Sequence, residues 1–104
     1  MAKYDFSRLY DQYPAIIGQM GQHFTSHEFI LELARQNQVA YIDALHAYRR
    51  TLRQGKPAPF MIVHGILARR LASHPKLVME VNPGVPSRDI FGGDNTASLW
   101  RKVG

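Results

Sequence analysis

The sequence predicts an all-α protein, a single domain over residues 1–104 with about four or five helices. Apolar residues recur with the 3.6-residue period of a helix in three separate segments. No segment shows the alternation of apolar and polar residues that is typical of a half-buried strand. With 104 residues, 45% of them hydrophobic, the chain has the length of one domain and enough apolar surface for one modest core.

The N-terminal segment fits two short helices or one kinked helix. Apolar residues from Phe6 to Tyr13 follow helical spacing behind Asp5, which can act as an N-cap. Pro14 either ends this helix or stands in the first turn of a second one, and the apolar face continues to Met20.

The next segment carries the strongest local signal of a helix start. Thr25 and Glu28 have the spacing of a capping box in front of an apolar run. Either one long helix follows over residues 26–53, or two helices meet near Asn37, where the sequence is polar. Gly55 is a good C-terminal stop for this helical region.

Residues 60–72 predict the central and most buried helix, with Pro59 in its first turn. Its bulky residues form one stripe and its small residues form a second: Phe60, Val63, Leu67 and Leu71 against Gly65, Ala68 and Ala72. A helix with two such stripes is contacted on two sides. We therefore expect it to pack between the N-terminal segment and the helical region before it.

The C-terminal quarter gives weaker signals. Residues 76–81 fit either a short helix or a short strand, and residues 82–84 (Asn-Pro-Gly) predict a turn. Residues 85–94 are expected to be irregular or to form a short hairpin. Asp94 or Asn95 can cap a last short helix.

Composition excludes several classes of protein. The chain has no cysteine, so a disulfide scaffold, a thiolate zinc site and a cysteine nucleophile are ruled out. Its apolar runs are far shorter than the roughly 20 residues that a membrane span requires, and its start lacks the apolar core of a signal peptide. We expect a cytoplasmic protein that does not contact membranes.

Charge is the feature that bears most on function. Between Asp43 and Glu80 there is no acidic residue, and the positive charges of this stretch exceed the net charge of +5 of the whole chain. The basic residues are Arg49, Arg50, Arg53, Lys56, Arg69, Arg70 and Lys76. A concentrated positive field attracts polyanions, and arginine can donate two hydrogen bonds to one phosphate. These seven residues predict a surface that binds nucleic acid mainly through phosphates, the alternative being a solvated face near helix C-termini.

A helix-turn-helix fits the sequence at two places, residues 33–39 and residues 67–78. In the second, the turn is Ser73-His74-Pro75 and the second helix would be short for reading a major groove. A winged variant would use residues 85–100 as the wing, although no alternating apolar residues support strands there.

The histidines do not predict a metal site or a catalytic centre. His23 and His27 are four residues apart, but the capping residues lie between them, so a shared helix is not expected. His64 lies on the bulky stripe of the 60–72 helix and is expected to be a hydrogen-bonded core residue. Because no catalytic motif is present either, we expect neither an enzyme nor a cofactor.

The rival function is protein–protein interaction, in a homodimer or with another partner. Trp100, next to Arg101 and Lys102, could anchor such an interface or could instead fold back to close the core. The tyrosines and phenylalanines are expected to pack in the core rather than to form a base-stacking platform.

Overall fold

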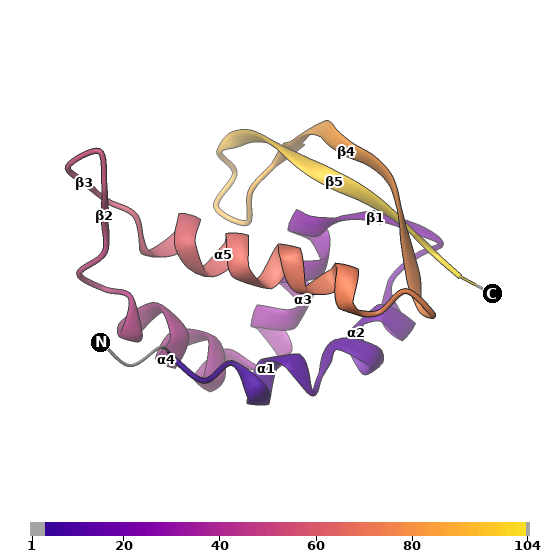
Figure 1. Ribbon diagram of the computed structural model, residues 1–104, viewed down its shortest axis with the longest axis horizontal. Coiled ribbons are helices and arrows are strands. Elements are labelled where there is room, and N and C mark those ends of the chain that lie inside the picture. Colours follow the sequence, from indigo (N-terminus) through magenta and orange to yellow (C-terminus); the bar gives the residue numbers. More distant parts are fainter. Residues whose placement is uncertain (1–3, 104) are drawn as a thin grey trace.

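The computed structural model describes residues 4–103, and the protein combines helices with antiparallel sheets (Figure 1). The helices are α1 (Ser7–Tyr10), α2 (Tyr13–Gln19), α3 (Ser26–Gln36), α4 (Gln38–Ala47), α5 (Pro59–Arg70) and the short 3₁₀ helix η1 (Leu71–Ser73). The strands are β1 (His23–Thr25), β2 (Leu52–Arg53), β3 (Lys56–Pro57), β4 (Val78–Arg88) and β5 (Asp94–Lys102). The class is α+β, with 47% helix and 27% strand, so the all-α prediction is wrong.

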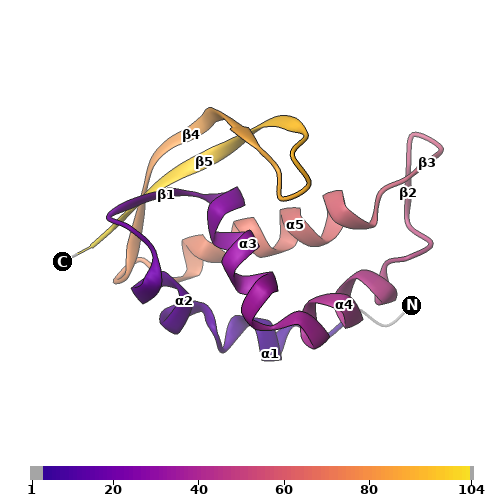
Figure 2. The same cartoon turned by 180° about the vertical axis from the view of Figure 1, so that it is seen from behind.

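Helix α5 runs across the middle of the molecule. The hairpin of β4 and β5 lies on one side of it and helices α1 and α2 lie on the other (Figure 1). Helix α3 crosses α5 and contacts both α5 and β5 (Figure 2). The small hairpin of β2 and β3 projects beyond the N-terminal end of α5 (Figures 1 and 2).

The three-stranded sheet has the order β1-β5-β4 and all of its pairs are antiparallel. Strand β5 is central: Trp100 pairs with Phe24 of β1 on one side and with Glu80 of β4 on the other. Because β1 leads directly into α3, this pairing fixes the start of α3 against the sheet.

The core gathers around α3. Tyr13 packs edge-on against Phe29 with ring centroids 4.7 Å apart, and its hydroxyl donates a 2.5 Å hydrogen bond to the carbonyl of Leu67. Helix α3 buries Ser26, Phe29, Ile30, Leu33 and Ala34, whereas α5 buries only Val63 and Leu67. The most buried helix is therefore α3, and the prediction that gave this place to residues 60–72 is wrong.

The local predictions for the first two helical regions are confirmed except for the first cap, because the N-cap of α1 is Phe6 and not Asp5. Pro14 lies in the first turn of α2, which makes the N-terminal segment two short helices. In the capping box, Thr25 Oγ1 accepts a hydrogen bond of 3.2 Å from the amide of Glu28, and Glu28 Oε1 accepts one of 2.9 Å from the amide of Thr25. Asn37 has non-helical backbone angles and separates α3 from α4.

The predicted helix over residues 26–53 extends too far, because α4 ends at Ala47. Residues 52–57 form a hairpin in which Gln54 and Gly55 both have positive φ, 55° and 77°. Such a pair of residues is typical of the tight turn whose twist matches that of two antiparallel strands. Gly55 therefore closes a hairpin rather than a helix, and the arginines from 49 to 53 do not form a helical row.

The C-terminal predictions of a turn at 82–84 and a helix after Asp94 are also wrong. Residues 82–84 lie inside β4, where the pairing with β5 shifts register between Glu80 and Asn82 and again between Asn82 and Val85. An edge strand tolerates proline and glycine at such bulges. Most of β4 is exposed, so its residues do not alternate between a core face and a solvent face, and the sequence lacks the usual strand pattern.

Candidate functional site

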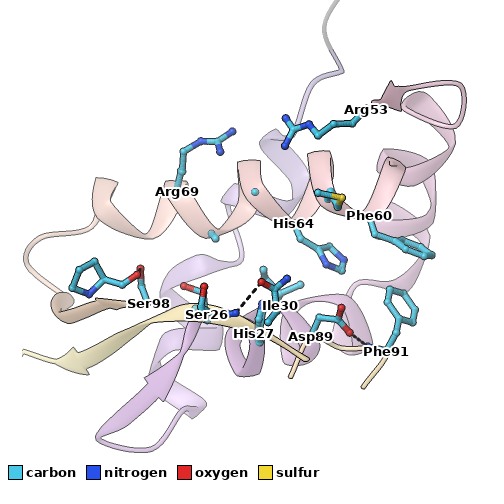
Figure 3. A pocket seen from close by; sticks show the side chains of 17 residues that line it. Ser26, His27, Ile30, Arg53, Phe60, His64, Arg69, Asp89, Phe91 and Ser98 are labelled. Carbon is cyan, nitrogen blue, oxygen red and sulfur yellow. Dashed lines mark hydrogen bonds between the residues drawn. The ribbon is translucent and has the colours of Figure 1, made fainter. Parts of the chain in front are cut away.

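A cleft of about 370 Å³ lies between α5 and the β4–β5 hairpin, next to the start of α3 (Figure 3). One face of α5 forms a wall of this cleft through Phe60, Met61, His64, Gly65, Ala68 and Arg69. The loop between β4 and β5, the outer half of β5 and Arg53 from β2 complete it. The cleft joins elements that are distant in the sequence.

Small residues keep the cleft open. Gly65 and Ala68 belong to the small stripe that predicted a second packing face on this helix. Both line the cleft, so this stripe bounds a cavity. A Cβ added to Gly65 would lie 3.2 Å from Nη1 of Arg69, which shows that the Arg69 guanidinium rests against Gly65.

Two exposed aromatic rings meet at the mouth of the cleft. The ring centroids of Phe60 and Phe91 are 4.2 Å apart, although the two residues are 47% and 58% exposed. The His64 ring lies parallel to Phe91, with an interplanar angle of 9° and a centroid distance of 6.0 Å. The mouth therefore offers flat π surfaces to solvent.

The loop that holds Phe91 is braced from within. Asp89 Oδ1 accepts hydrogen bonds of 2.9 Å from the amides of both Phe91 and Gly93. These bonds stabilise the carboxylate and lower the pKa of Asp89. Gly92 has a φ of 85°, a left-handed conformation that glycine adopts without strain. Phe91 thus stands on a loop with a defined shape.

His64 is an uncharged polar group in the cleft wall. Its Nε2 lies 2.5 Å from the Tyr41 hydroxyl. Burial lowers the pKa of His64 to about 4 and raises that of Tyr41 to about 12, so both are neutral at pH 7. Nearby, His27 Nδ1 lies 2.8 Å from the hydroxyl of Ser87 and links α3 to β4. The prediction that His64 is hydrogen bonded is confirmed, but it is only half-buried.

Arg53 and Arg69 bring positive charge to the cleft from two elements. Figure 3 shows their guanidinium groups pointing toward one another along the same side of α5. The salt bridges found within residues 4–103 join other arginines to carboxylates: Arg8 to Asp43, Arg35 to Glu32 and Arg88 to Asp94. None of the seven basic residues singled out in the sequence is paired with a carboxylate in this part of the chain.

The remaining five residues of that set are exposed, and none of them lines the cleft. Arg49 and Arg50 follow α4, and Lys56 stands opposite Arg53 in the β2–β3 hairpin. Arg70 turns to the other side of α5 and lies 4.3 Å above the ring of Tyr10, while Lys76 precedes β4. Within the described residues, Arg53 and Arg69 are therefore the two members of the set that meet at the cleft.

Trp100 lies in the core. It is 4% exposed, and its Nε1 donates a 2.9 Å hydrogen bond to Oγ of Ser26, the buried first residue of α3. The sequence left open whether Trp100 anchors an interface or folds back to close the core, and in the structure it closes the core.

His23 lies exposed on β1, apart from the α3 residue His27. Across residues 4–103, no three His, Asp or Glu side chains converge to hold a metal ion.

Of the two helix-turn-helix matches, only one joins two helices. Residues 67–78 pass from α5 through η1 into β4, so this match has no second helix. Residues 33–39 do join two helices, α3 and α4, while residues 85–100 fall in the β4–β5 hairpin.

Sequence reasoning missed the aromatic mouth of the cleft. Its one signal was Phe91, a large apolar residue among the turn-forming residues Asp89, Gly92 and Gly93.

No helix within the described residues combines the length and the apolar character needed to cross a bilayer. Comparison with protein-family models, with curated proteins and with solved structures finds no match for this chain. The function is therefore inferred from the chemistry of the cleft.

Proposed function

We propose that the protein binds nucleic acid along the cleft face of α5 and the adjacent β2–β3 hairpin, mainly through phosphate contacts. The observation that carries this proposal is the arginine pair at the cleft. Arg53 and Arg69 point toward one another (Figure 3), and within residues 4–103 neither has a carboxylate partner. Two guanidinium groups placed in this way can each donate paired hydrogen bonds to a phosphate.

The charge pattern of the β2–β3 hairpin supports an anionic partner. Arg53 and Lys56 are directly opposite one another in strands of two residues each. Like charges at opposed positions destabilise a hairpin, and a bound phosphate would remove that repulsion. Arg69 and Arg70 lie in the last turn of α5, where cations also stabilise the helix dipole. The β2–β3 hairpin offers no such reason for its charges.

A binding role fits the cleft better than catalysis. Of the two histidines that line the cleft, His64 has a pKa lowered to about 4 by burial, which makes its imidazole a weak proton acceptor. One oxygen of the nearby Asp89 carboxylate already accepts hydrogen bonds from two backbone amides. Arginine and phenylalanine, the other prominent groups, bind phosphates and bases but are poor proton-transfer groups. The cytoplasm is the compartment we propose for this activity.

The test is the salt dependence of binding. We expect a fluorescein-labelled 20-nucleotide probe to bind with a Kd that rises steeply between about 20 and 200 mM KCl, because neutralised phosphates release counterions. Near physiological salt, such sequence-independent binding has a Kd on the order of micromolar or weaker. Replacing Arg53 and Arg69 together by glutamine should weaken binding and reduce the slope of log K against log salt by about 2.

The matched control is Arg8→Gln with Arg35→Gln. This variant loses the same net charge, but each of its arginines is already paired with a carboxylate. We expect its salt slope to stay near that of the unsubstituted protein. Equal losses of affinity in the two double variants would show that the effect comes from overall charge, and would contradict the proposal. So would the absence of binding to duplex and single-stranded probes at low salt.

The rival candidate is protein–protein interaction, and a different surface favours it. Val39 and Ile42, three residues apart on α4, are 69% and 59% exposed. Two large aliphatic residues on one helical face form an exposed apolar patch that another protein chain can cover. A concentration-dependent change of mass in light scattering that disappears in Val39→Glu, with nucleic-acid binding absent, would favour this function instead.

A further inference from the structure

We infer that the cleft receives an unpaired base from a single-stranded nucleic acid, with the neighbouring phosphates on Arg53 and Arg69. The base would stack on the aromatic mouth formed by Phe60 and Phe91. This assignment rests on the proposed function and names the form of nucleic acid that the same site takes.

The first argument is the exposure of two phenylalanines in a chain that buries the others. Phe6, Phe24 and Phe29 are 6% exposed or less, whereas Phe60 and Phe91 are about half exposed and in contact with one another. Exposed apolar rings are unfavourable in water unless something covers them. Base–aromatic stacking contributes about 1–3 kcal/mol per base and does not depend strongly on sequence.

Second, positive and negative charges lie on different sides of the cleft. The cations Arg53 and Arg69 lie along one side of α5, while the carboxylate of Asp89 lies with Phe91 on the hairpin side (Figure 3). Asp89 would repel a phosphate from the hairpin side of the cleft. An entering nucleotide is therefore oriented with its phosphates toward the arginines and its base toward the rings.

The third argument is the polarity and size of the interior. Neutral hydrogen-bonding groups of His64, Asn95, Thr96 and Ser98 line the cleft among apolar atoms. A volume of about 370 Å³ fits a small group rather than a rod of stacked base pairs. Bases in a duplex are held in the stack, whereas those of a single strand can be splayed out onto aromatic side chains.

The test compares one sequence in two forms. Fluorescence anisotropy would be measured for a labelled 12-nucleotide single strand and for its blunt duplex at the same salt, with a 2-aminopurine base in the strand to report stacking. We expect tighter binding of the single strand and quenching of 2-aminopurine on binding. Phe91→Ala should weaken single-strand binding by about 5- to 150-fold, the range that base stacking covers, and abolish most of the quenching.

The controls separate stacking from charge and from folding. Ile42→Ala removes an apolar side chain of nearly equal exposure, 59% against 58%, from α4 and should leave binding unchanged. The salt slope of Phe91→Ala should stay near that of the unsubstituted protein, because no cation is lost. Phe60→Ala provides a second variant on a different element, and circular dichroism verifies that each variant is folded.

The outcomes are distinct. If the duplex binds as tightly as the single strand, or if Phe91→Ala and Phe60→Ala behave like Ile42→Ala, the single-strand inference is overturned while the proposed function stands. If adenosine monophosphate displaces the strand at equal concentration, the cleft is a mononucleotide site and the inference is again overturned. If neither probe binds at low salt, both the inference and the proposed function fail.

Discussion

The two faces of α5 differ in what covers them. Val63 and Leu67 on one face have no exposed surface and pack into the core. Phe60 and Met61 on the cleft side are 47% and 59% exposed, and Arg69 is exposed beside them. One helix therefore packs into the core with one face and lines the cleft with the other. We therefore expect substitutions in α5 to separate the stability of the fold from the proposed binding.

The largest effect is expected on the core face. Leu67→Ala should reduce the free energy of unfolding by about 2–5 kcal/mol, because it opens a cavity among fully buried side chains. Urea unfolding followed by circular dichroism measures the change. Met61→Ala on the cleft side of the same helix should change it by less than about 0.5 kcal/mol. Similar losses in the two variants would break the distinction between the faces.

The next effect tests how the β4–β5 hairpin is fastened to the core. Trp100→Phe removes the hydrogen bond from Nε1 to Ser26 and leaves a buried hydroxyl without its donor. We expect a loss of about 1–3 kcal/mol. A double-mutant cycle with Ser26→Ala isolates the bond from the change in ring size. A coupling energy near zero would mean that packing alone holds the hairpin.

Acid should destabilise the protein through His64, a residue of the cleft wall whose pKa is lowered by burial. Its pKa is about 4 in the fold against 6.5 in an unfolded chain, so the unfolded state takes up the proton first. Stability from this group is complete above pH 6.5 and is lost as pH falls toward 4. For full burial the loss is about 3 kcal/mol, and partial exposure reduces it to about 1–2 kcal/mol.

The measurement for His64 is urea unfolding at pH 7.0 and pH 4.5 for the protein and for His64→Gln. The difference between the two pH values should be smaller in the variant. His74, whose pKa burial also lowers, is present in both proteins and cancels from the comparison. An equal decline in the two proteins would show that His64 does not contribute.

The smallest effect on stability is expected at the arginine pair. Replacing Arg53 and Arg69 by glutamine should change the free energy of unfolding by less than about 0.5 kcal/mol, since both are exposed and form no salt bridge in the part of the chain that the structure describes. The same variant is expected to bind nucleic acid more weakly and with a smaller salt slope. A melting temperature that falls together with affinity would instead assign the two arginines a structural role.

Helix boundaries set by local chemistry were predictable from the sequence. The capping box of Thr25 and Glu28, the proline in the first turn of α2 and the break at Asn37 each act within a few residues. Pro59 likewise begins α5. At these places the local preference and the tertiary structure agree.

The sheet was not predictable in this way, because its cause is not local. Strand β5 carries helix-capping residues at Asp94 and Asn95, yet it pairs with β4 along its length and with β1 at residues 99–101. Tertiary pairing overrides these weak local signals.

For the cleft, the sequence identified Arg53 and Arg69 among seven cations. The contact of Phe60 with Phe91 depends on how the β4–β5 hairpin lies over α5, which no single segment encodes.

The most direct test of the central claim is a map of the binding surface by NMR. Amide chemical shifts would be recorded for the ¹⁵N-labelled protein during titration with the 12-nucleotide single strand at low salt. We expect the largest changes on the cleft face of α5, around His64 and Gly65, and on the loop of Phe91, with little change at the core-facing Leu67. Changes centred on α4 around Val39, or no changes at all, would contradict it.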